Sequence, residues 1–442
     1  MKRRHFIKTI GAAVAFPTLI PASALGRDGF VAPSNRIAMG SIGLGGQGSG
    51  NTRNFLGDKR VQLVALCDVC KRSNRYGYGH NNTCGAEVFK EQNRLDVPIY
   101  NDFRELIARP DIDAVTTATP DHWHAIIDIA CANAGKDVHG EKPLTRTVTE
   151  GRYLCDAVRR NGIIWQTGSW QRSVREFWYA CELVRNGAIG KVKLIKIGLP
   201  SNAEVPPLKP EPVPEELDWD MWLGPAQYAD YHPFRAFTTW RFFSDYSAGK
   251  IADWGAHHLD IAHWAMGYDL SGPVKIEPIE VPLDKNGNKP KLWQKDGFYD
   301  LSMNFNVRFT YERGEVVEMS NRHKMGLEII GEEGTIWVDR GRLASSPSNI
   351  VDIKISPTED TRLYGLENPN HIGAFIDSVL NRRLAVTDIE TAHRTNTGCL
   401  LAEIAYTTGR TINWDYKNEK IIGDEQASRM LSRAYRGNWQ LV

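Results

Sequence analysis

Residues 36–48 have the sequence Arg36-Ile37-Ala38-Met39-Gly40-Ser41-Ile42-Gly43-Leu44-Gly45-Gly46-Gln47-Gly48. The apolar first half predicts a short buried strand, and the G-x-G-x-x-G after it opens a predicted helix over residues 48–56. Glycines are needed there because a pyrophosphate must approach the backbone N–H groups of the helix N-terminus without a Cβ in the way. We therefore predict that a dinucleotide contacts this turn through Gly43, Leu44, Gly45, Gly46, Gln47 and Gly48.

Asp68 ends the next predicted strand, residues 61–67, and lies 20 residues after Gly48. An acidic side chain at that place accepts hydrogen bonds from the adenosine ribose hydroxyls, and its charge repels the 2′-phosphate of NADP. Lys71 and Arg72 follow closely and could soften that preference. We expect NAD rather than NADP as the cofactor, and the sequence leaves open whether it exchanges or stays tightly bound.

Helices and strands continue to alternate through residue 168. The predicted elements are helix 100–107, strand 112–118, a helix ending at 134, strand 136–140, helix 149–161 and strand 162–168. This alternation predicts a doubly wound parallel sheet covered on both faces, an α/β Rossmann domain over residues 35–168. Ligands bind outside the carboxyl ends of such strands. Two motifs fall there and supply the predicted cofactor contacts Thr119, Pro120, His124, Glu141 and Lys142.

The rest of the chain predicts a second domain of a different class. After a helix over residues 174–186, few helices interrupt the last five of six predicted strands, which are 191–198, 273–281, 301–311, 315–321, 327–330 and 335–338. The pattern predicts an α+β domain over residues 169–415 with a large, mainly antiparallel, open-faced sheet. Its free face could hold a ligand or a partner. Residues 200–250 are predicted to form a long ordered excursion from this domain. Residues 416–442 are predicted to form a C-terminal tail that packs on the body of the protein.

Residues 249–264 are predicted to be helical and carry the candidate chemistry. Asp253 and His257 are four residues apart and His257 and Asp260 three apart, so one helix face carries carboxylate, imidazole and carboxylate. A neighbouring carboxylate fixes the tautomer of an imidazole and stabilises its protonated form. Oxidation of an alcohol needs such a base, and the Lys142 cation could polarise the reacting oxygen. The alternative is structural, with Asp253 as a helix cap and His257 as a core histidine.

These motifs resemble the glucose–fructose oxidoreductase/inositol dehydrogenase (Gfo/Idh/MocA) family. The glycine turn, Thr119-Pro120-x-x-x-His124, Glu141-Lys142-Pro143 and Asp253-x-x-x-His257-x-x-Asp260 occur in that family's order and spacing. The resemblance implies a Rossmann domain, an open-faced sheet that often mediates oligomerisation, a Lys142 that contacts substrate and nicotinamide ribose, and His257 as general base. His258 is a departure, and the helix would place it off the His257 face.

Further aromatic, basic and histidine side chains are candidates for a carbohydrate pocket. The predicted substrate contacts are Trp123, Arg172, Trp240, Arg241, Tyr246, His258 and His371, with Trp170 as a further candidate. Cys67-x-x-Cys70 with His80 and Cys84 could suggest zinc. Cys67 ends a buried strand, however, so no metal site is predicted.

The first 24 residues predict a signal peptide. Arg3 and Arg4 precede an apolar stretch over residues 10–20, and Ala22-Ser23-Ala24 matches an A-x-A cleavage pattern. The stretch is too short for a permanent membrane helix and contains Pro17. We expect twin-arginine export, a periplasmic location and no membrane anchor after signal removal. With the second-domain excursion, the signal resembles an exported bacterial branch of the family that acts on sugars or glycosides.

Three functions remain open from sequence. The net charge of +1 predicts no nucleic-acid partner, and seven cysteines in mostly apolar runs predict buried thiols. The first function is an NAD-dependent dehydrogenase acting on a sugar, glycoside or cyclitol. The second is a glycosidase-type reaction with a transiently reduced, recycled NAD, which some relatives use on N-acetylgalactosaminides. The third is a non-catalytic binding protein that carries the cofactor.

Overall fold

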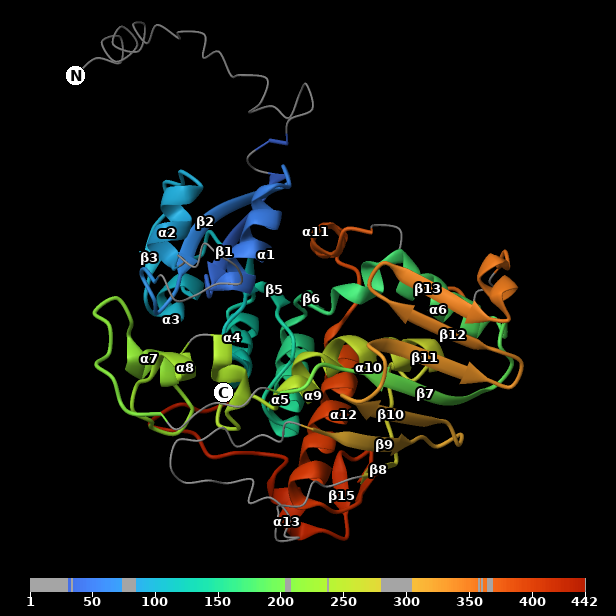
Figure 1. Ribbon diagram of the computed structural model, residues 1–442. Coiled ribbons are helices and arrows are strands. Elements are labelled where there is room, and N and C mark those ends of the chain that lie inside the picture. Colours follow the sequence, from blue (N-terminus) through green and yellow to red (C-terminus); the bar gives the residue numbers. More distant parts are fainter. Residues whose placement is uncertain are drawn as a thin grey trace, which may run out of the picture.

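Six parallel strands form the sheet of the first lobe, in the order β3-β2-β1-β4-β5-β6 (Figure 1). The strand order reverses between β1 and β4, so the loops after these two strands diverge and leave a crevice between them. The elements of this lobe are β1 (Ile37–Ile42), α1 (Gly46–Leu56), β2 (Val61–Cys67), α2 (Ala86–Gln92), β3 (Ile99–Tyr100), α3 (Phe103–Ile107), β4 (Ala114–Thr117), α4 (Asp121–Asn133), β5 (Asp137–Gly140), α5 (Val148–Asn161) and β6 (Trp165–Thr167).

The computed structural model describes residues 31–32, 35–73, 85–202, 208–236, 238–279, 304–356, 358, 361–363 and 369–441. The predicted signal peptide lies outside these residues. Among the described helices, none combines the length and the apolar character that crossing a membrane requires.

Local capping explains several helix boundaries. Thr147 and Glu150 form a capping box at the start of α5, and the left-handed Gly162 ends that helix. Asp102 caps α3 by accepting a hydrogen bond from the Arg104 backbone. The predicted helix 100–107 therefore begins too early, because residues 99–100 pair with β2 as a strand.

Nine strands form the sheet of the second lobe, in the order β13-β12-β11-β7-β10-β9-β8-β14-β15. Every neighbouring pair is antiparallel except β7 and β10, which confirms the mainly antiparallel second domain. In chain order, the first elements of this lobe are η3 (Trp170–Ser173), α6 (Arg175–Arg185), β7 (Val192–Gly198), α7 (Trp219–Leu223), α8 (Pro233–Ala236), η4 (Thr238–Phe242), α9 (Lys250–Asp253), α10 (Gly255–Met266) and β8 (Lys275–Pro278). The remaining elements are β9 (Asn306–Thr310), β10 (Val316–Ser320), β11 (Gly326–Gly331), β12 (Thr335–Asp339), β13 (Arg342–Ser346), η5 (Ser348–Asp352), α11 (His371–Asn381), α12 (Ile389–Thr408), β14 (Ile412–Asp415), β15 (Lys420–Ile422) and α13 (Glu425–Arg429).

The C-terminal helices tie the two lobes together. Side chains of α10 and α12 share one core with the buried face of the large sheet. Helix α11 returns to the first lobe, where Phe375 and Ile376 pack against Met39 of β1. The predicted boundary at residue 415 falls inside a hairpin, because β15 pairs with β14 and belongs to the sheet rather than to a separate tail.

Candidate active site

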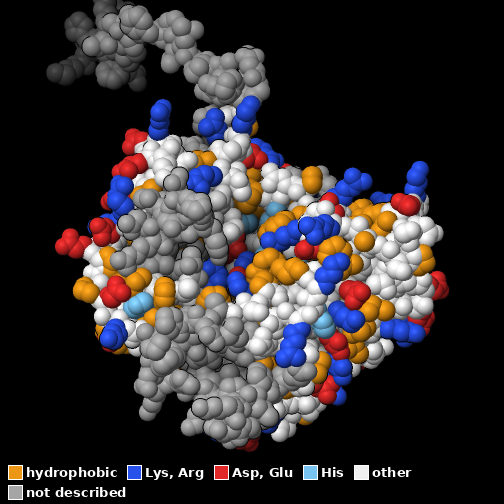
Figure 2. Space-filling view, in the orientation of Figure 1, with side chains coloured by type: hydrophobic (Ala, Val, Ile, Leu, Met, Phe, Trp, Pro, Cys, Tyr) orange, Lys and Arg blue, Asp and Glu red, His pale blue; other side chains and the backbone are white. Residues whose placement is uncertain are grey.

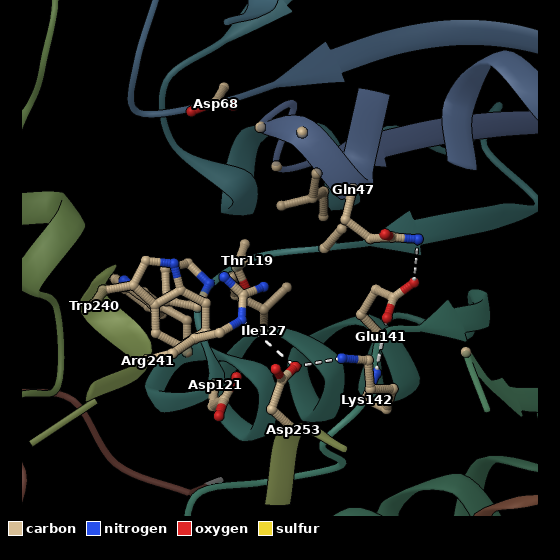
Figure 3. Close-up of a pocket in the computed structure, with 18 of the residues that line it drawn as sticks. Gln47, Asp68, Thr119, Asp121, Ile127, Glu141, Lys142, Trp240, Arg241 and Asp253 are labelled. Atoms are coloured by element: carbon tan, nitrogen blue, oxygen red, sulfur yellow. Dashed lines mark hydrogen bonds and ion pairs between the residues drawn. The ribbon is translucent and has the colours of Figure 1, made fainter. Parts of the chain in front are cut away.

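A cavity of about 540 Å³ lies between the lobes, at the carboxyl ends of the parallel strands. Gly43 and Asp68 line it on the first lobe, and Asp253 and His257 line it on the second. Figure 3 shows Asp253 between Arg241 and Lys142, with Gln47 and Glu141 nearby and Asp68 at the opposite end of the view. The cavity is therefore continuous from the glycine turn to the candidate chemistry.

The glycine turn has the shape that a dinucleotide needs. Gly43 has φ +85°, and a Cβ there would lie 2.6 Å from the carbonyl oxygen of Ala118. Gly45 precedes α1 without a side-chain cap, so the first N–H groups of this 11-residue helix are open to a phosphate. These features fit NAD, whose pyrophosphate would lie against Gly45, Gly46 and Gln47 at the wall of the cavity.

Leu44 and Gly48, two of the predicted cofactor contacts, shape the glycine turn itself. Leu44 buries its side chain in the core beside β2, and a Cβ on Gly48 would lie 1.9 Å from the Gly43 carbonyl oxygen. Neither residue lines the cavity, and the contacts seen for both lie within the protein. The Asp68 carboxylate holds the turn from the other side, accepting hydrogen bonds from the backbone N–H of Leu44 at 2.5 Å and Cys70 at 2.8 Å. Burial raises the pKa of Asp68 to about 6, against these hydrogen bonds.

The motifs after β4 and β5 meet beside the turn. Thr119 and Pro120 line the cavity, whereas His124 does not. Its two ring nitrogens lie 2.7 Å from the carbonyl oxygen of Pro143 and 2.8 Å from that of Thr119, so His124 joins the two loops instead of contacting a ligand. Glu141 lines the cavity and accepts a hydrogen bond from Asn51 Nδ2 at 2.8 Å.

Lys142 and Asp253 form an ion pair across the lobes. Lys142 Nζ is 2.5 Å from Asp253 Oδ1, and Lys250 Nζ is 2.8 Å from Asp253 Oδ2. Arg241 Nε lies 3.5 Å from the same carboxylate. Burial opposes ionisation of Asp253, but the cations of Lys142, Arg241 and Lys250 outweigh it and hold the pKa of this carboxyl well below its usual range. Asp253 is therefore an anion that orients the Lys142 amine.

His257 is buried, with 4% of its surface exposed, and lines the same cavity. Burial, followed by the cations of Lys142 and Arg340, holds its pKa well below the usual range. Its ring is therefore neutral at neutral pH and able to accept a proton. Its Nδ1 has no hydrogen-bond partner among the described residues.

The structure brings together two of the three side chains on the predicted face of carboxylate, imidazole and carboxylate. A turn at Trp254 separates α9 from α10, and Asp253 and His257 line the same cavity on either side of it. Asp253 pairs with Lys142, and Asp260 pairs with the buried Arg172 at 2.7 Å. Of the three side chains, Asp253 and His257 share the cavity and Asp260 lies outside it.

Comparison with known proteins places this geometry in a family. Residues 37–169 match the family model described as "Oxidoreductase family, NAD-binding Rossmann fold", and residues 203–441 match the one described as "Oxidoreductase family, C-terminal alpha/beta domain". The chain belongs to the Gfo/Idh/MocA oxidoreductase family.

The Gfo/Idh/MocA relatives include enzymes of different named activities. The chain is 30% identical to Glycosyl hydrolase family 109 protein 1 of Shewanella sp. (strain ANA-3) over 43% of this chain and 44% of that protein. It thus spans less than half the length of this relative. It is 26% identical to the myo-inositol 2-dehydrogenase of Thermotoga maritima over 69% of this chain and 76% of that protein. The scyllo-inositol dehydrogenase of Lactobacillus casei, solved with NAD(H) and scyllo-inositol, shares the fold with a TM-score of 0.57 and 19% identity over 85% of this chain and 98% of that one.

The structure divides the predicted substrate residues of this Gfo/Idh/MocA chain into two groups. Trp123, Trp240 and Arg241 line the cavity, as does Trp170. The other four do not line it and are buried by contacts within the protein. Arg172 pairs with Asp260 and Asp269, Tyr246 packs in the aromatic core of the excursion, His258 Nδ1 lies 3.2 Å from Gln171 Oε1, and His371 Nε2 lies 2.8 Å from the Thr167 carbonyl oxygen.

Several cavity residues were not found from sequence. They are Asp121, Lys250, Trp254 and Arg340, together with Met221 and Trp222 of the excursion. Lys250 precedes Asp253 by three residues, and this i,i+3 spacing on a predicted helix could have indicated their ion pair. Arg340 lies in the turn between β12 and β13, and no local pattern marks it.

The cysteines that the structure describes do not form a metal site. Cys67 and Cys70 are both buried, and burial is the main reason that the pKa of Cys67 lies well above its usual value. In the part of the chain that the structure covers, no group of three His, Cys, Asp or Glu residues could hold a metal ion. His80 and Cys84 of the possible zinc motif lie outside the described residues.

Proposed function

We propose that this oxidoreductase oxidises a hydroxyl of a sugar, glycoside or cyclitol by transferring hydride to NAD, with His257 as the general base. The observation that carries the proposal is one continuous cavity that joins the glycine turn to Lys142, Asp253 and His257. Inositol dehydrogenases among the relatives support the substrate class.

The residues divide the chemistry among them. Bound NAD supplies the hydride acceptor. His257, neutral because of burial and neighbouring cations, takes the proton of the reacting hydroxyl. Lys142 places a positive charge next to the oxygen and stabilises the developing alkoxide. Asp253 fixes the Lys142 amine in position through the 2.5 Å ion pair.

We also propose NAD rather than NADP, because Asp68 lines the cofactor end of the cavity. Its carboxylate would repel a 2′-phosphate. Lys71, which could soften this preference, donates its backbone N–H to the Glu216 carbonyl oxygen at 2.9 Å and does not line the cavity.

The excursion between β7 and α9 supports slow exchange of the cofactor. Its backbone joins the loop after β2, where the Asp218 N–H donates to the Val69 carbonyl oxygen at 2.9 Å. Met221 and Trp222 then line the cavity, and Figure 1 shows α7 and α8 beside α3 and α4. Arg436 of the C-terminal segment pairs with Asp220 at 2.6 Å and holds the excursion in place. We infer that NAD is enclosed and tightly bound.

An enclosed cofactor favours a second candidate, glycoside cleavage with NAD reduced and reoxidised in each turnover. Similarity to the glycosyl hydrolase family 109 proteins supports it. The two candidates predict different products, because only the dehydrogenase accumulates reduced cofactor or needs an external acceptor. A third, a binding protein without catalysis, predicts that no substrate changes the cofactor's oxidation state.

One experiment separates these functions. The purified protein is denatured and the released nucleotide identified, and the native protein is then tested on a panel of polyols, sugars and glycosides for NADH formation and for bond cleavage. We expect released NAD and turnover that Lys142→Ala and His257→Ala abolish. A protein that releases no nucleotide, binds no added NAD and turns over no member of the panel would refute the proposal.

Two further proposals concern location and assembly. The twin-arginine pattern at residues 3–4 supports export to the periplasm, which fractionation of the native host tests directly. The free face of the large sheet supports a homo-oligomer through that face. It carries the Arg308–Glu318 and Lys196–Glu328 pairs, so we expect a polar interface, tested by light scattering with charge-reversal variants of Arg308.

A further inference from the structure

We propose that the substrate of this cavity is an anionic carbohydrate and that Arg340 binds its carboxylate or sulfate group. This inference rests on the proposed function and adds the charge class of the substrate. It begins with an arginine that reaches the catalytic end of the cavity from the turn between β12 and β13.

Arg340 is held by aromatic rings and not by an acid. Its guanidinium lies 4.7 Å from the ring centre of Trp170 and 4.4 Å from that of Trp254, and all three residues line the cavity. Within the described parts of the chain, no hydrogen bond or ion pair involves its side chain. A guanidinium stacked on indole faces keeps its N–H donors free at its edge, where a planar carboxylate can accept two of them.

Three further cations lie at this end of the cavity. Lys142, Lys250 and Arg241 surround the single carboxylate of Asp253. Figure 2 shows Lys and Arg side chains, coloured blue, at the hollow in the middle of the viewed face. Arg340 adds a fourth positive charge, and burial lowers its pKa although Asp339 and Asp253 act in the opposite direction.

The remaining acids of the cavity do not balance Arg340. Asp121 accepts a hydrogen bond from Ser247 at 2.6 Å, and burial raises its pKa. Glu141 accepts hydrogen bonds from Asn51 and Gln47 beside the glycine turn. Asp68 lies at the opposite end of the cavity from Asp253 (Figure 3). The cavity lining thus carries four basic and four acidic side chains, but each acid has other partners and none is paired with Arg340. An anionic group on the substrate would be the partner that this guanidinium lacks.

The phosphates of the cofactor are not the anion that we expect Arg340 to bind. The pyrophosphate belongs at the N-terminus of α1, and a 2′-phosphate would lie near Asp68. Arg340 instead acts electrostatically on His257 and lies over Trp254, next to the proposed base. The anion it meets is therefore part of the molecule that is oxidised. The indole faces of Trp170, Trp240 and Trp254 suit the apolar face of its sugar ring.

Binding to NAD-loaded protein, measured by calorimetry, tests the inference without turnover. The probes are matched pairs: methyl glycosides of glucose, galactose and mannose, each with its uronic acid counterpart, and glucose with glucose 6-sulfate. We expect the acidic member of at least one pair to bind about tenfold or more tightly than the neutral member. Comparing the uronic acids with glucose 6-sulfate shows whether the site prefers a carboxylate or a sulfate group.

The variant Arg340→Gln should remove most of this preference, and Arg340→Lys should retain part of it. Arg342→Gln is the matched control, because Arg342 is exposed, lies two residues further along and does not line the cavity. Equal or tighter binding of the neutral member in every pair overturns the inference, as does a preference that survives in Arg340→Gln. Binding of none of the acidic probes counts against it too. Oxidation of neutral sugars alone would leave the proposed function standing while refuting this inference.

Discussion

Lys142 Nζ lies 2.5 Å from Asp253 Oδ1, although 111 residues separate them in the chain. Lys142 follows β5 of the first lobe and Asp253 ends α9 of the second, so this contact joins the two lobes. Both side chains are largely buried, with 15% and 7% of their surfaces exposed. The pair places a cation at the same cavity as His257, as the proposed alcohol oxidation needs.

Replacing Lys142 with alanine should nearly abolish catalysis. The variant loses the charge that stabilises the alkoxide, so we expect kcat/KM to fall by about 10²–10³-fold or more. Steady-state kinetics on the best substrate of the panel measures this. Lys59→Ala, an exposed lysine of the first lobe that does not line the cavity, is the control and should keep full activity. An active Lys142→Ala protein would remove Lys142 from the mechanism.

The pH dependence of kcat/KM should reflect the lowered pKa of His257. Because the neutral ring is the active form, activity should persist as the pH falls through the ordinary histidine range near 6.5 and decline only at lower pH. The same shift affects stability, since the unfolded chain binds this proton first and stability falls as the pH drops below about 6.5. Thermal melts at each pH separate the two effects. An acid limb near pH 6.5 in a folded protein would contradict His257 as a buried base.

Asp68→Ser should change cofactor preference. The variant loses the hydrogen bonds to the ribose and the repulsion of a 2′-phosphate, so the ratio of the Kd for NADP to that for NAD should fall by about tenfold or more. Fluorescence titration of cofactor-free protein measures both constants. Asp96→Ser changes an exposed acid outside the cavity and should leave the ratio unaltered. A constant ratio in Asp68→Ser would show that another group discriminates between the cofactors.

Arg172→Met should lower the stability of the protein and leave substrate binding unchanged. The guanidinium is paired with Asp260 and Asp269, each at 2.7 Å, and its removal leaves the buried Asp260 without its cation. We expect the free energy of unfolding to fall by about 3–5 kcal/mol, measured by urea denaturation. Combining it with Asp260→Leu should recover part of the loss. A large rise in KM with unchanged stability would restore Arg172 as a substrate residue.

Local patterns were sufficient for the first lobe and for the cofactor end of its cleft. A strand, a glycine turn and a helix are contiguous in the chain, so Gly43, Gly45 and Asp68 could be placed from their spacing alone. The alternation of strands and helices likewise predicted the parallel sheet that the structure contains. Periodicity could not show that the helix is interrupted at Trp254, or that Asp253 forms an ion pair with Lys142 of the first lobe.

Only the tertiary structure determined which charged side chains form ion pairs and which enter the cavity. Asp253 pairs with Lys142, Asp260 with Arg172, and Arg340 enters the cavity from a turn between two strands of the large sheet. Each of these contacts joins segments 80 or more residues apart, so no local pattern contains it. The physical reason is that a buried charge takes the partner that the packing of the lobes brings within reach, whatever its distance along the chain.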